Sequence, residues 1–165
     1  VVRGGVGRDT LCGDQGADKL FGGSAGDTLL GGDGADRIKG NNGRDNITGG
    51  TGADLITGGK GVDTFIFTEA GDSSKGPSGR DIITDFDDGV DKLDFSAIDA
   101  DIATIGNDPL RFLGHDSFTG TPGEIRFSHN SKRTMIKIDL DGDMYADMKI
   151  ELTDWHQLEP GDFIL

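Results

Sequence analysis

The chain has 165 residues and a formal net charge of −14 at pH 7, with a sequence pI near 4.3. This acidity excludes the basic footprint of a nucleic-acid-binding domain, and no apolar run approaches the roughly 20 residues that span a bilayer. The single cysteine, Cys12, excludes an internal disulfide, and the length fits one domain or two small ones.

The composition divides the chain into two parts. Residues 4–63 hold 19 of the 29 glycines and a single aromatic residue, Phe21, whereas residues 64–165 hold the other eight phenylalanines. The acidic residues are 26 aspartates and only 4 glutamates. Aspartate is the carboxylate favoured in turns and in hard-cation sites. We expect the second part to build an ordinary core and the first to need a stabilising factor other than hydrophobic burial. The start at Val1, without a methionine, indicates the C-terminal part of a longer protein.

Seven nonapeptides follow one another without a gap. They are GGVGRDTLC (4–12), GDQGADKLF (13–21), GGSAGDTLL (22–30), GGDGADRIK (31–39), GNNGRDNIT (40–48), GGTGADLIT (49–57) and GGKGVDTFI (58–66). Position 1 is always glycine, position 6 is always aspartate, and position 8 is always a large apolar residue.

Each position of the repeat has a physical role. Glycine lets the backbone turn sharply with positive φ, which brings carbonyl oxygens close together, and the aspartate adds a carboxylate. These oxygens are the ligand set of a hard cation, calcium above all. We expect six residues of each unit to form a metal-binding turn and three to form a strand whose position-8 side chain points inward. Two nine-residue units then give one coil, and stacked coils build two parallel sheets around a thin aliphatic core, with calcium between the turns of units i and i+2.

The pattern G-G-x-G-x-D-x-U-x, where U is a large apolar residue, resembles the calcium-binding nonapeptide of RTX proteins, whose fold is the right-handed parallel β-roll. The resemblance covers residues 4–66 and implies several bound calcium ions, about five or six. It implies that the position-6 aspartates are ligands: Asp9, Asp18, Asp27, Asp36, Asp45, Asp54 and Asp63. It also implies that turn carbonyls complete the sites: those of Gly5, Gly7, Gly16, Gly23, Gly32, Gly34, Gly43, Gly50, Gly52, Gly59 and Gly61.

The alternative for this segment is a disordered linker rich in glycine and aspartate, which composition alone would favour. The regular apolar residue at position 8 argues against a linker when calcium is present. Without calcium we expect the disordered state, because converging aspartates repel one another and the strands bury little apolar surface. Ala25, at position 4 of the third unit, resists positive φ, which predicts strain in the turn before Asp27. No ligand role is expected for the variable turn residues Asp14, Asp33 and Asn41.

A degenerate eighth unit follows after an insertion. GPSGRDIIT (76–84) keeps glycine at positions 1 and 4, Asp81 at position 6 and Ile83 at position 8. The inserted segment, 67–75, has the length of one whole unit, so the phase of the repeat is preserved. Our hypothesis is that Asp81 closes the last calcium site, and a chance match is the alternative.

Strand-like apolar residues continue around the turn DDGVD (87–91). They are Ile82, Ile83, Phe86, Leu93, Phe95 and Ile98. This block, with DTFIF (63–67) before it, resembles the segment that joins RTX rolls to the C-terminal domain of serralysin-type secreted metalloproteases, and alginate epimerase R-modules carry a similar block. The resemblance spans essentially the whole chain. It implies an all-β fold with the β-roll at 1–66, and with the degenerate last turn and a β-rich capping domain at 67–165.

Residues 135–152 alternate between apolar and polar side chains on both sides of an acidic loop, which predicts a hairpin. The apolar positions are Ile136, Ile138, Leu140, Met148, Ile150 and Leu152, and the loop aspartates are Asp139, Asp141, Asp143 and Asp147. The spacing resembles an EF-hand loop, although Ile150 stands where that loop needs glutamate. A solvated acidic turn and a calcium site are the two interpretations.

The chain ends in DFIL (162–165), an acidic residue followed by three apolar ones. This terminus is similar to the uncleaved signal of proteases exported by type I secretion, which an ABC transporter complex reads in the unfolded chain. The resemblance implies export from a Gram-negative bacterium and an extracellular location. A final strand that packs on the core is a second interpretation, compatible with the first.

No catalytic motif is present. His115, His129 and His156 are not arranged as H-E-x-x-H, and no G-x-S-x-G elbow occurs. We expect the histidines to be surface or structural residues. We also expect Cys12 to face outward, and Trp155 to pack on the core rather than to form a sugar-binding surface with His156.

The sequence therefore predicts a non-catalytic calcium-binding module with a type I secretion signal, part of a secreted enzyme such as a metalloprotease or an epimerase. Its expected partners are calcium and the export apparatus, with no nucleic acid and no transmembrane segment. Two alternatives remain. One is polysaccharide binding, for which Lys60, Arg37 and Lys39 are the basic candidates, and the other is the spacer of an adhesin.

Overall fold

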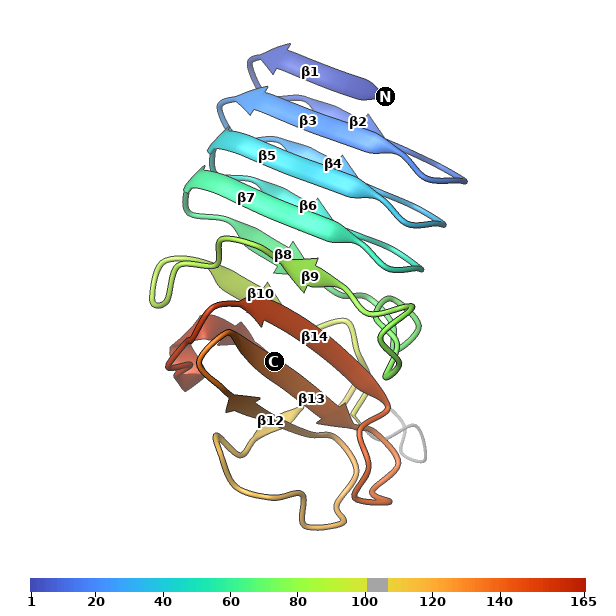
Figure 1. The fold of residues 1–165 in the computed structure, drawn as a ribbon, viewed down its shortest axis with the longest axis vertical. Coiled ribbons are helices and arrows are strands. Elements are labelled where there is room, and N and C mark those ends of the chain that lie inside the picture. Colours follow the sequence, from blue (N-terminus) through green and yellow to red (C-terminus); the bar gives the residue numbers. More distant parts are fainter. Residues whose placement is uncertain (101–106) are drawn as a thin grey trace.

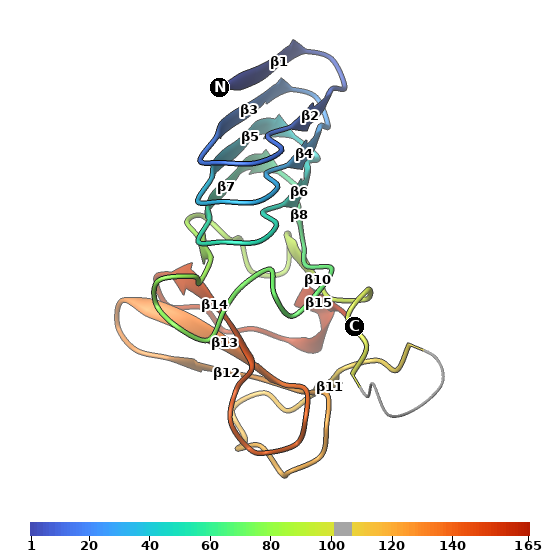
Figure 2. The same cartoon turned by 90° about the vertical axis from the view of Figure 1, so that its right-hand side faces the viewer.

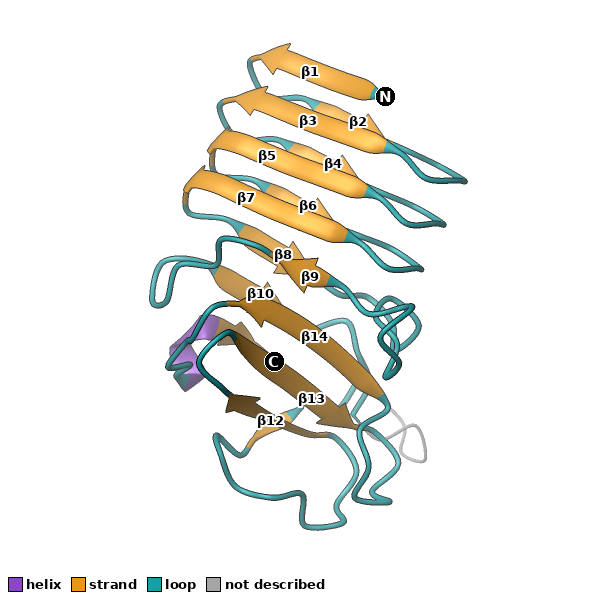
Figure 3. Cartoon of the chain, viewed as in Figure 1, coloured by secondary structure: helices purple, strands orange, loops and turns teal. Residues whose placement is uncertain are grey.

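The computed structural model describes residues 1–100 and 107–165, which form two sheets arranged as a tall stack (Figure 1). Sheet A has the spatial order β1 (Val2–Val6), β3 (Lys19–Ser24), β5 (Arg37–Gly43), β7 (Leu55–Gly61), β9 (Ile82–Ile83), β14 (Met148–Thr153), β13 (Arg133–Asp139), β12 (Glu124–His129) and β11 (Arg111–Phe112). Sheet B has the order β15 (Phe163–Ile164), β10 (Lys92–Asp94), β8 (Thr64–Ile66), β6 (Asn46–Thr48), β4 (Thr28–Leu30) and β2 (Thr10–Cys12). Within these ranges the only helical element is the 3-10 turn η1 (Pro160–Asp162), shown in Figure 3, and no helix has the length and hydrophobicity to cross a membrane.

The first half of the chain winds back and forth between the two sheets, which face each other as two walls in Figure 2. Every strand pair in this half is parallel, and the partners are one coil apart. Leu20 pairs with Ile38 in sheet A and Leu11 pairs with Leu29 in sheet B, both at a separation of two nonapeptides. The predicted parallel β-roll of stacked two-unit coils is therefore confirmed.

The core of the roll is a single file of aliphatic side chains between the sheets. The position-8 residues are at most 3% exposed: Leu11, Leu20, Leu29, Ile38, Ile47, Ile56 and Phe65. In sheet B each is the middle residue of a three-residue strand, and in sheet A each is the second residue of its strand. The residues on either side point away from the core, because side chains alternate across a strand. The core is thus continuous along the stack and only one side chain deep from each sheet, as the repeat predicted.

The strands of the two sheets differ in length. In sheet B the strands β2, β4, β6 and β8 have three residues each, as predicted. In sheet A, β3, β5 and β7 have six or seven, because pairing continues into the next unit, for example from Gly23 to Asn41 to Gly59. The prediction of a six-residue turn is wrong for these units. Coils stacked in strict register let the N–H and C=O groups of the turn pair with those of the adjacent coil.

Turn positions 2 and 4 have positive φ in all seven units, including the three that lack glycine there. Asp14, Ala25 and Asn41 have φ values of 69°, 75° and 77°. The predicted strain at Ala25 does not displace the turn, and the next carboxylate, that of Asp27, is 2% exposed and aligned with its neighbours. Neighbouring coils impose the left-handed conformation even on alanine.

The second half extends both sheets beyond the repeat. Ile83 in β9 pairs with Ile56, and Leu93 in β10 pairs with Phe65, so the eighth unit adopts the strand position that its phase predicted. Sheet A then continues through the antiparallel strands β14, β13 and β12. The predicted hairpin is confirmed, with Ile136 opposite Ile150.

Aromatic side chains fill the space below the last coil. Phe67 stacks on Phe95 with ring centroids 5.1 Å apart, and Phe112 meets Phe163 at 5.0 Å. Phe163 lies in β15, the terminal strand, which pairs in parallel with β10. The interpretation of the last residues as a final strand on the core is therefore confirmed.

The turn geometry predicts that Ala25→Gly stabilises the folded protein. A left-handed alanine costs roughly 1–2 kcal/mol, and the added freedom of glycine in the unfolded chain costs about 0.4–1 kcal/mol. We expect a net gain of about 0.5–1 kcal/mol, measured as a higher urea midpoint in calcium. Ala53→Gly is the control, because Ala53 has no positive φ, and it should lower the midpoint. A shift of both variants in the same direction would contradict the explanation.

Candidate metal centre

The position-6 aspartates form two hydrogen-bonded ladders along the edges of the roll. In each rung, the backbone N–H of one aspartate donates to the Oδ1 of the aspartate one coil further on, at N–O distances of 2.7–2.9 Å. The first ladder, where the chain enters sheet B, contains Asp9, Asp27, Asp45, Asp63 and Asp91. The second, where it enters sheet A, contains Asp18, Asp36, Asp54 and Asp81. All eight aspartates predicted as ligands therefore lie in the ladders.

The second carboxylate oxygen of most ladder residues has no hydrogen-bond donor. The Oδ2 atoms concerned are buried and belong to Asp9, Asp27, Asp36, Asp45, Asp54 and Asp81. Buried polar atoms without a partner are rare and costly, and anionic oxygens most of all. Among the described residues no lysine or arginine pairs with a ladder carboxylate, and only the terminal amine of Val1 approaches one, 3.7 Å from Asp18. The ladders thus present oxygen atoms that fit an oxygen-seeking cation.

Burial raises the pKa of several ladder carboxyls. It raises the pKa of Asp54 to about 7, that of Asp63 to about 6 and that of Asp81 to about 9, and the neighbouring carboxylates add to the effect. The backbone N–H donors act in the opposite direction but do not outweigh the burial. Without a cation, burial and the neighbouring carboxylates therefore make ionisation of these groups harder than in solvent, and most of all for Asp81.

The glycine carbonyls predicted as ligands lie in the stacked turns. A Cβ on Gly23 would collide with the carbonyl oxygen of Gly5, and a Cβ on Gly34 with that of Gly16. The same contact recurs between Gly52 and the carbonyl oxygen of Gly34. Glycine is required here because each turn lies directly on the backbone of the preceding one. The repeated contacts stack the backbone of these turns in columns along the roll.

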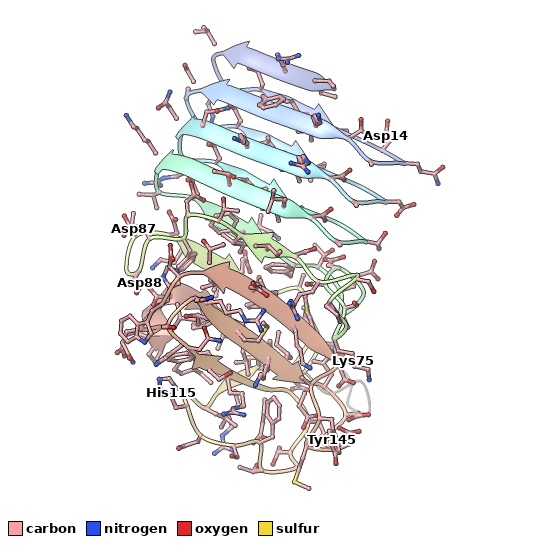
Figure 4. All side chains as sticks on the ribbon, in the orientation of Figure 1. Asp14, Lys75, Asp87, Asp88, His115 and Tyr145 are labelled. Atoms are coloured by element: carbon pink, nitrogen blue, oxygen red, sulfur yellow. The ribbon has the colours of Figure 1, made fainter. Side chains whose placement is uncertain are left out.

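The variable turn residues lie outside the ladders. Asp33 is exposed and accepts a hydrogen bond from the hydroxyl of Thr51 at 2.9 Å. Asp14 lies on the projecting turn between β2 and β3 (Figure 4). Their carboxylates are solvated, so the repeat separates them from the buried ladder carboxylates.

Asp91 is a ladder residue that the sequence reasoning missed. Its Oδ1 accepts the N–H of Asp63 at 2.9 Å, and its Oδ2 accepts the N–H of Asp87 at 3.1 Å. Asp91 therefore ends the first ladder with both oxygens bonded. The segment GVDKL (89–93) contains part of the repeat pattern, with glycine at position 4, aspartate at position 6 and leucine at position 8. The pattern is hard to recognise because Phe86 occupies position 1, where the other units have glycine.

The hairpin loop brings together three of its four aspartates. Asp139, Asp141 and Asp147 each offer a carboxylate oxygen within 4.8 Å of the others. Asp139 is fully buried and accepts hydrogen bonds from the N–H groups of Gly142 and Met144, so its carboxylate also holds the loop in shape. Burial raises the pKa of Asp139. The geometry is compatible with both interpretations of the loop.

The remaining candidate residues have structural or surface roles. His156 is bonded through Nδ1 to Asp88 at 2.6 Å and through Nε2 to the carbonyl of Thr153 at 2.7 Å, which fixes the loop before β10. Cys12 is exposed, as predicted. The expectation that Trp155 packs on the core is wrong, because its side chain is 50% exposed and lies against His129.

A parallel β-roll whose turns carry buried aspartate ladders defines the class of the protein as an RTX-type β-roll module. The chain belongs to the family described as Peptidase M10 serralysin C terminal, which matches residues 4–165. It is 38% identical over 89 residues to the metalloprotease AprA of Pseudomonas entomophila (strain L48). These aligned residues make up 53% of this chain and 17% of AprA. The chain therefore spans only a minor part of this relative.

Two solved structures have a similar fold. One is the AlgE6R3 subunit of the Azotobacter vinelandii mannuronan C5-epimerase, with a TM-score of 0.65 and 29% identity, covering 92% of this chain and 80% of that one. The other is the AlgE6R2 subunit of the same epimerase, with a TM-score of 0.60 and 26% identity, covering 92% of each chain. These similarities confirm the all-β roll architecture and the family resemblance that the repeats indicated.

The pKa shifts predict an inverse pH dependence in the absence of calcium. Carboxyls with a pKa raised above the unfolded value of about 4 bind more protons in the folded state, so folding weakens as pH rises from about 4 to about 9. In chelator, strand content by circular dichroism and the urea midpoint should both be higher at acidic pH than above neutrality. Asp54→Asn should reduce this dependence and Asp33→Asn should not, and a midpoint that rises with pH would contradict it.

Proposed function

We propose that the chain is a non-catalytic, calcium-folded module that carries a C-terminal export signal for a domain upstream of it. The observation that supports the proposal best is the set of buried Oδ2 atoms that have no hydrogen-bond donor. Calcium accepts six to eight oxygen ligands and tolerates irregular geometry, which suits a carboxylate beside several turn carbonyls. Bound calcium supplies the positive charge that the described side chains do not.

The proposed ligands are the eight predicted aspartates with the turn carbonyls of the glycines named above. We propose about five or six bound ions, because about that many pairs of turns are stacked one coil apart. Asp91 is not included, because its second oxygen already accepts a hydrogen bond from Asp87. It would act instead as the end of the first ladder.

Folding is coupled to calcium through mass action. Sites of the extracellular class bind with Kd values of roughly 10⁻⁴–10⁻³ M, so they stay empty at cytosolic calcium and fill outside the cell. Each ion that binds only the folded state stabilises it. The chain would remain open for export and fold after it.

We propose residues 1–66 as the calcium-dependent roll and residues 67–165 as the last turn and cap. Strands β9 and β10 place the last two ladder residues, Asp81 and Asp91, beneath the roll. The phenylalanine core under them buries large aromatic side chains, whereas the roll buries only a single file of mostly aliphatic side chains. The cap therefore supplies a nucleus on which the coils stack.

The proposed export signal is the terminal segment 162–165, recognised by a type I ABC transporter complex. In the folded protein Asp162 is buried, Phe163 is buried in β15, and β15 is paired with β10. Two of its four side chains are therefore accessible only when this end of the chain is unfolded, which is compatible with export before calcium binding. The parent protein would be a secreted bacterial metalloprotease, and the module its non-catalytic C-terminal part.

Calcium titration tests the folding proposal. Millimolar calcium should convert a coil-like circular dichroism spectrum to a strand spectrum, and magnesium should not substitute because it requires tight octahedral geometry. Asp36→Asn keeps an acceptor for the N–H of Asp18 but removes the charge, so it should lower the number of bound ions by at least one in calorimetry. Asp33→Asn is the control and should match the parent. A folded spectrum in chelator at neutral pH would refute the proposal.

Export is tested separately with a passenger protein fused to the N-terminus of the module. A type I apparatus should secrete the fusion, and deletion of residues 163–165 should keep it inside the cell. Asp36→Asn should leave export intact and reduce only folding outside, because the signal is read before calcium binds. Secretion of the deletion variant at the parental level would refute the signal without affecting the calcium proposal.

A further inference from the structure

One dipeptide of the roll can modify itself. Asn42-Gly43 is the only place in the chain where asparagine precedes glycine. Because glycine has no side chain, its amide nitrogen can reach the side-chain carbonyl carbon of the preceding asparagine without obstruction. The nitrogen bonds to that carbon to close a succinimide ring, and its proton leaves with the side-chain amino group as ammonia. Water then opens the ring to aspartate or isoaspartate, so the net change is the uptake of water and the loss of ammonia.

The folded roll holds the dipeptide in an unreactive geometry. Asn42 lies in β5 and is paired on both sides, with Ser24 in β3 and with Lys60 in β7 (Figure 1). An extended backbone directs the following N–H toward a neighbouring strand and away from the residue's own side chain. Ring closure therefore requires the peptide after Asn42 to rotate out of the sheet.

Gly43 is held by the coils on both sides of it. It pairs with Gly61 in β7, and a Cβ on it would collide with the carbonyl oxygen of Ala25 in the preceding coil. The equivalent glycine of the fourth unit, Gly34, donates its N–H to the carbonyl of Thr51 in the following coil at 2.7 Å. Rotation of the labile peptide must therefore break contacts with two coils at once.

The side chain of Asn42, in contrast, is exposed, so water already reaches the group that would be replaced. Protection comes from the backbone alone. We propose that Asn42-Gly43 is a deamidation site that stacked coils protect and open coils expose. Control of the reaction by calcium rests on the calcium-dependent folding proposed above, whereas protection by stacking does not.

The two products have different effects on the coil. Aspartate keeps the backbone unchanged and places a carboxylate beside Lys60, and opposite charges on paired strands stabilise a sheet. Isoaspartate routes the backbone through the former side chain and lengthens it by one methylene group. The lengthened backbone cannot keep Asn41 in register with both Gly23 and Gly59. A chain that forms isoaspartate before it folds therefore cannot complete this coil, so the site limits how long the chain can stay open and still fold.

Incubation at mildly alkaline pH in calcium, in chelator, and in calcium with urea tests the site. Released ammonia and the mass of the tryptic peptide 40–44 measure the conversion. Conversion in calcium should be at least about tenfold slower than in calcium with urea, because the reactive geometry is reached only when the coil opens. Chelator should give the fast rate. A slow rate in chelator with a fast rate in urea would refute calcium-dependent folding and would still support the site.

Asn42→Gln should abolish the conversion of this peptide, because its longer side chain closes the ring far more slowly. Asn46→Gln is the matched control, since it changes an exposed asparagine in β6 that the bulky Ile47 follows, and it should convert like the parent. The comparison in urea does not require either variant to fold. Equal rates in all three solutions would overturn the proposal, and so would parental conversion in Asn42→Gln.

Refolding tests the difference between the two products. Chains kept in chelator and returned to calcium should lose strand signal in circular dichroism in proportion to the isoaspartate found in peptide 40–44. Asn42→Gln should recover more signal than the parent after the same incubation, and freshly prepared Asn42→Asp should have a urea midpoint no lower than that of the parent. Full recovery by chains that contain isoaspartate at this position would overturn the proposed limit on folding.

Discussion

The fold of the roll depends on the hydrogen bond between the N–H of one ladder aspartate and the carboxylate of the aspartate one coil further on. This bond uses one oxygen of each carboxylate to fix the vertical spacing of the coils. It thereby forces the second oxygen inward, where most such oxygens have no donor. The same carboxylates therefore align the coils and concentrate negative charge between them. As a result, coils that are aligned in this way also need a bound cation.

The two halves of the chain are stabilised in different ways. The roll buries one file of aliphatic side chains, and its repeated carboxylates oppose stacking unless a cation is bound. The second half contains the stacked rings of Phe67 and Phe95 and the contact of Phe112 with Phe163. Both sheets run through the junction, since Ile83 and Leu93 extend them without a break. A conventional core thus supports a stack that could not easily stand alone.

The regular parts of the structure could be predicted because each repeat position has one physical task. Position 8 predicted the core, position 6 predicted carboxylates aligned between stacked turns but not the N–H groups that bond them, and the phase of the insertion placed Asp81 in line. The sequence did not reveal the long strands of sheet A, because their pairing through the turns depends on the adjacent coils rather than on local preference. Asp91 was missed because Phe86 occupies the place of the first glycine. The exposure of Trp155 depends on which aromatic residues fill the core, and the pattern does not encode that choice.

Every rung of the ladders has a direction, because the donor is always on the N-terminal side and the acceptor on the C-terminal side. The amide of a given coil is therefore satisfied only when the following coil is already in place. Asp91, with both oxygens bonded, is the fixed end of this series. Loss of the cap would consequently leave the amides of Asp54 and Asp63 without their acceptors, whereas loss of the first coil would leave no amide of the remaining ladders without one.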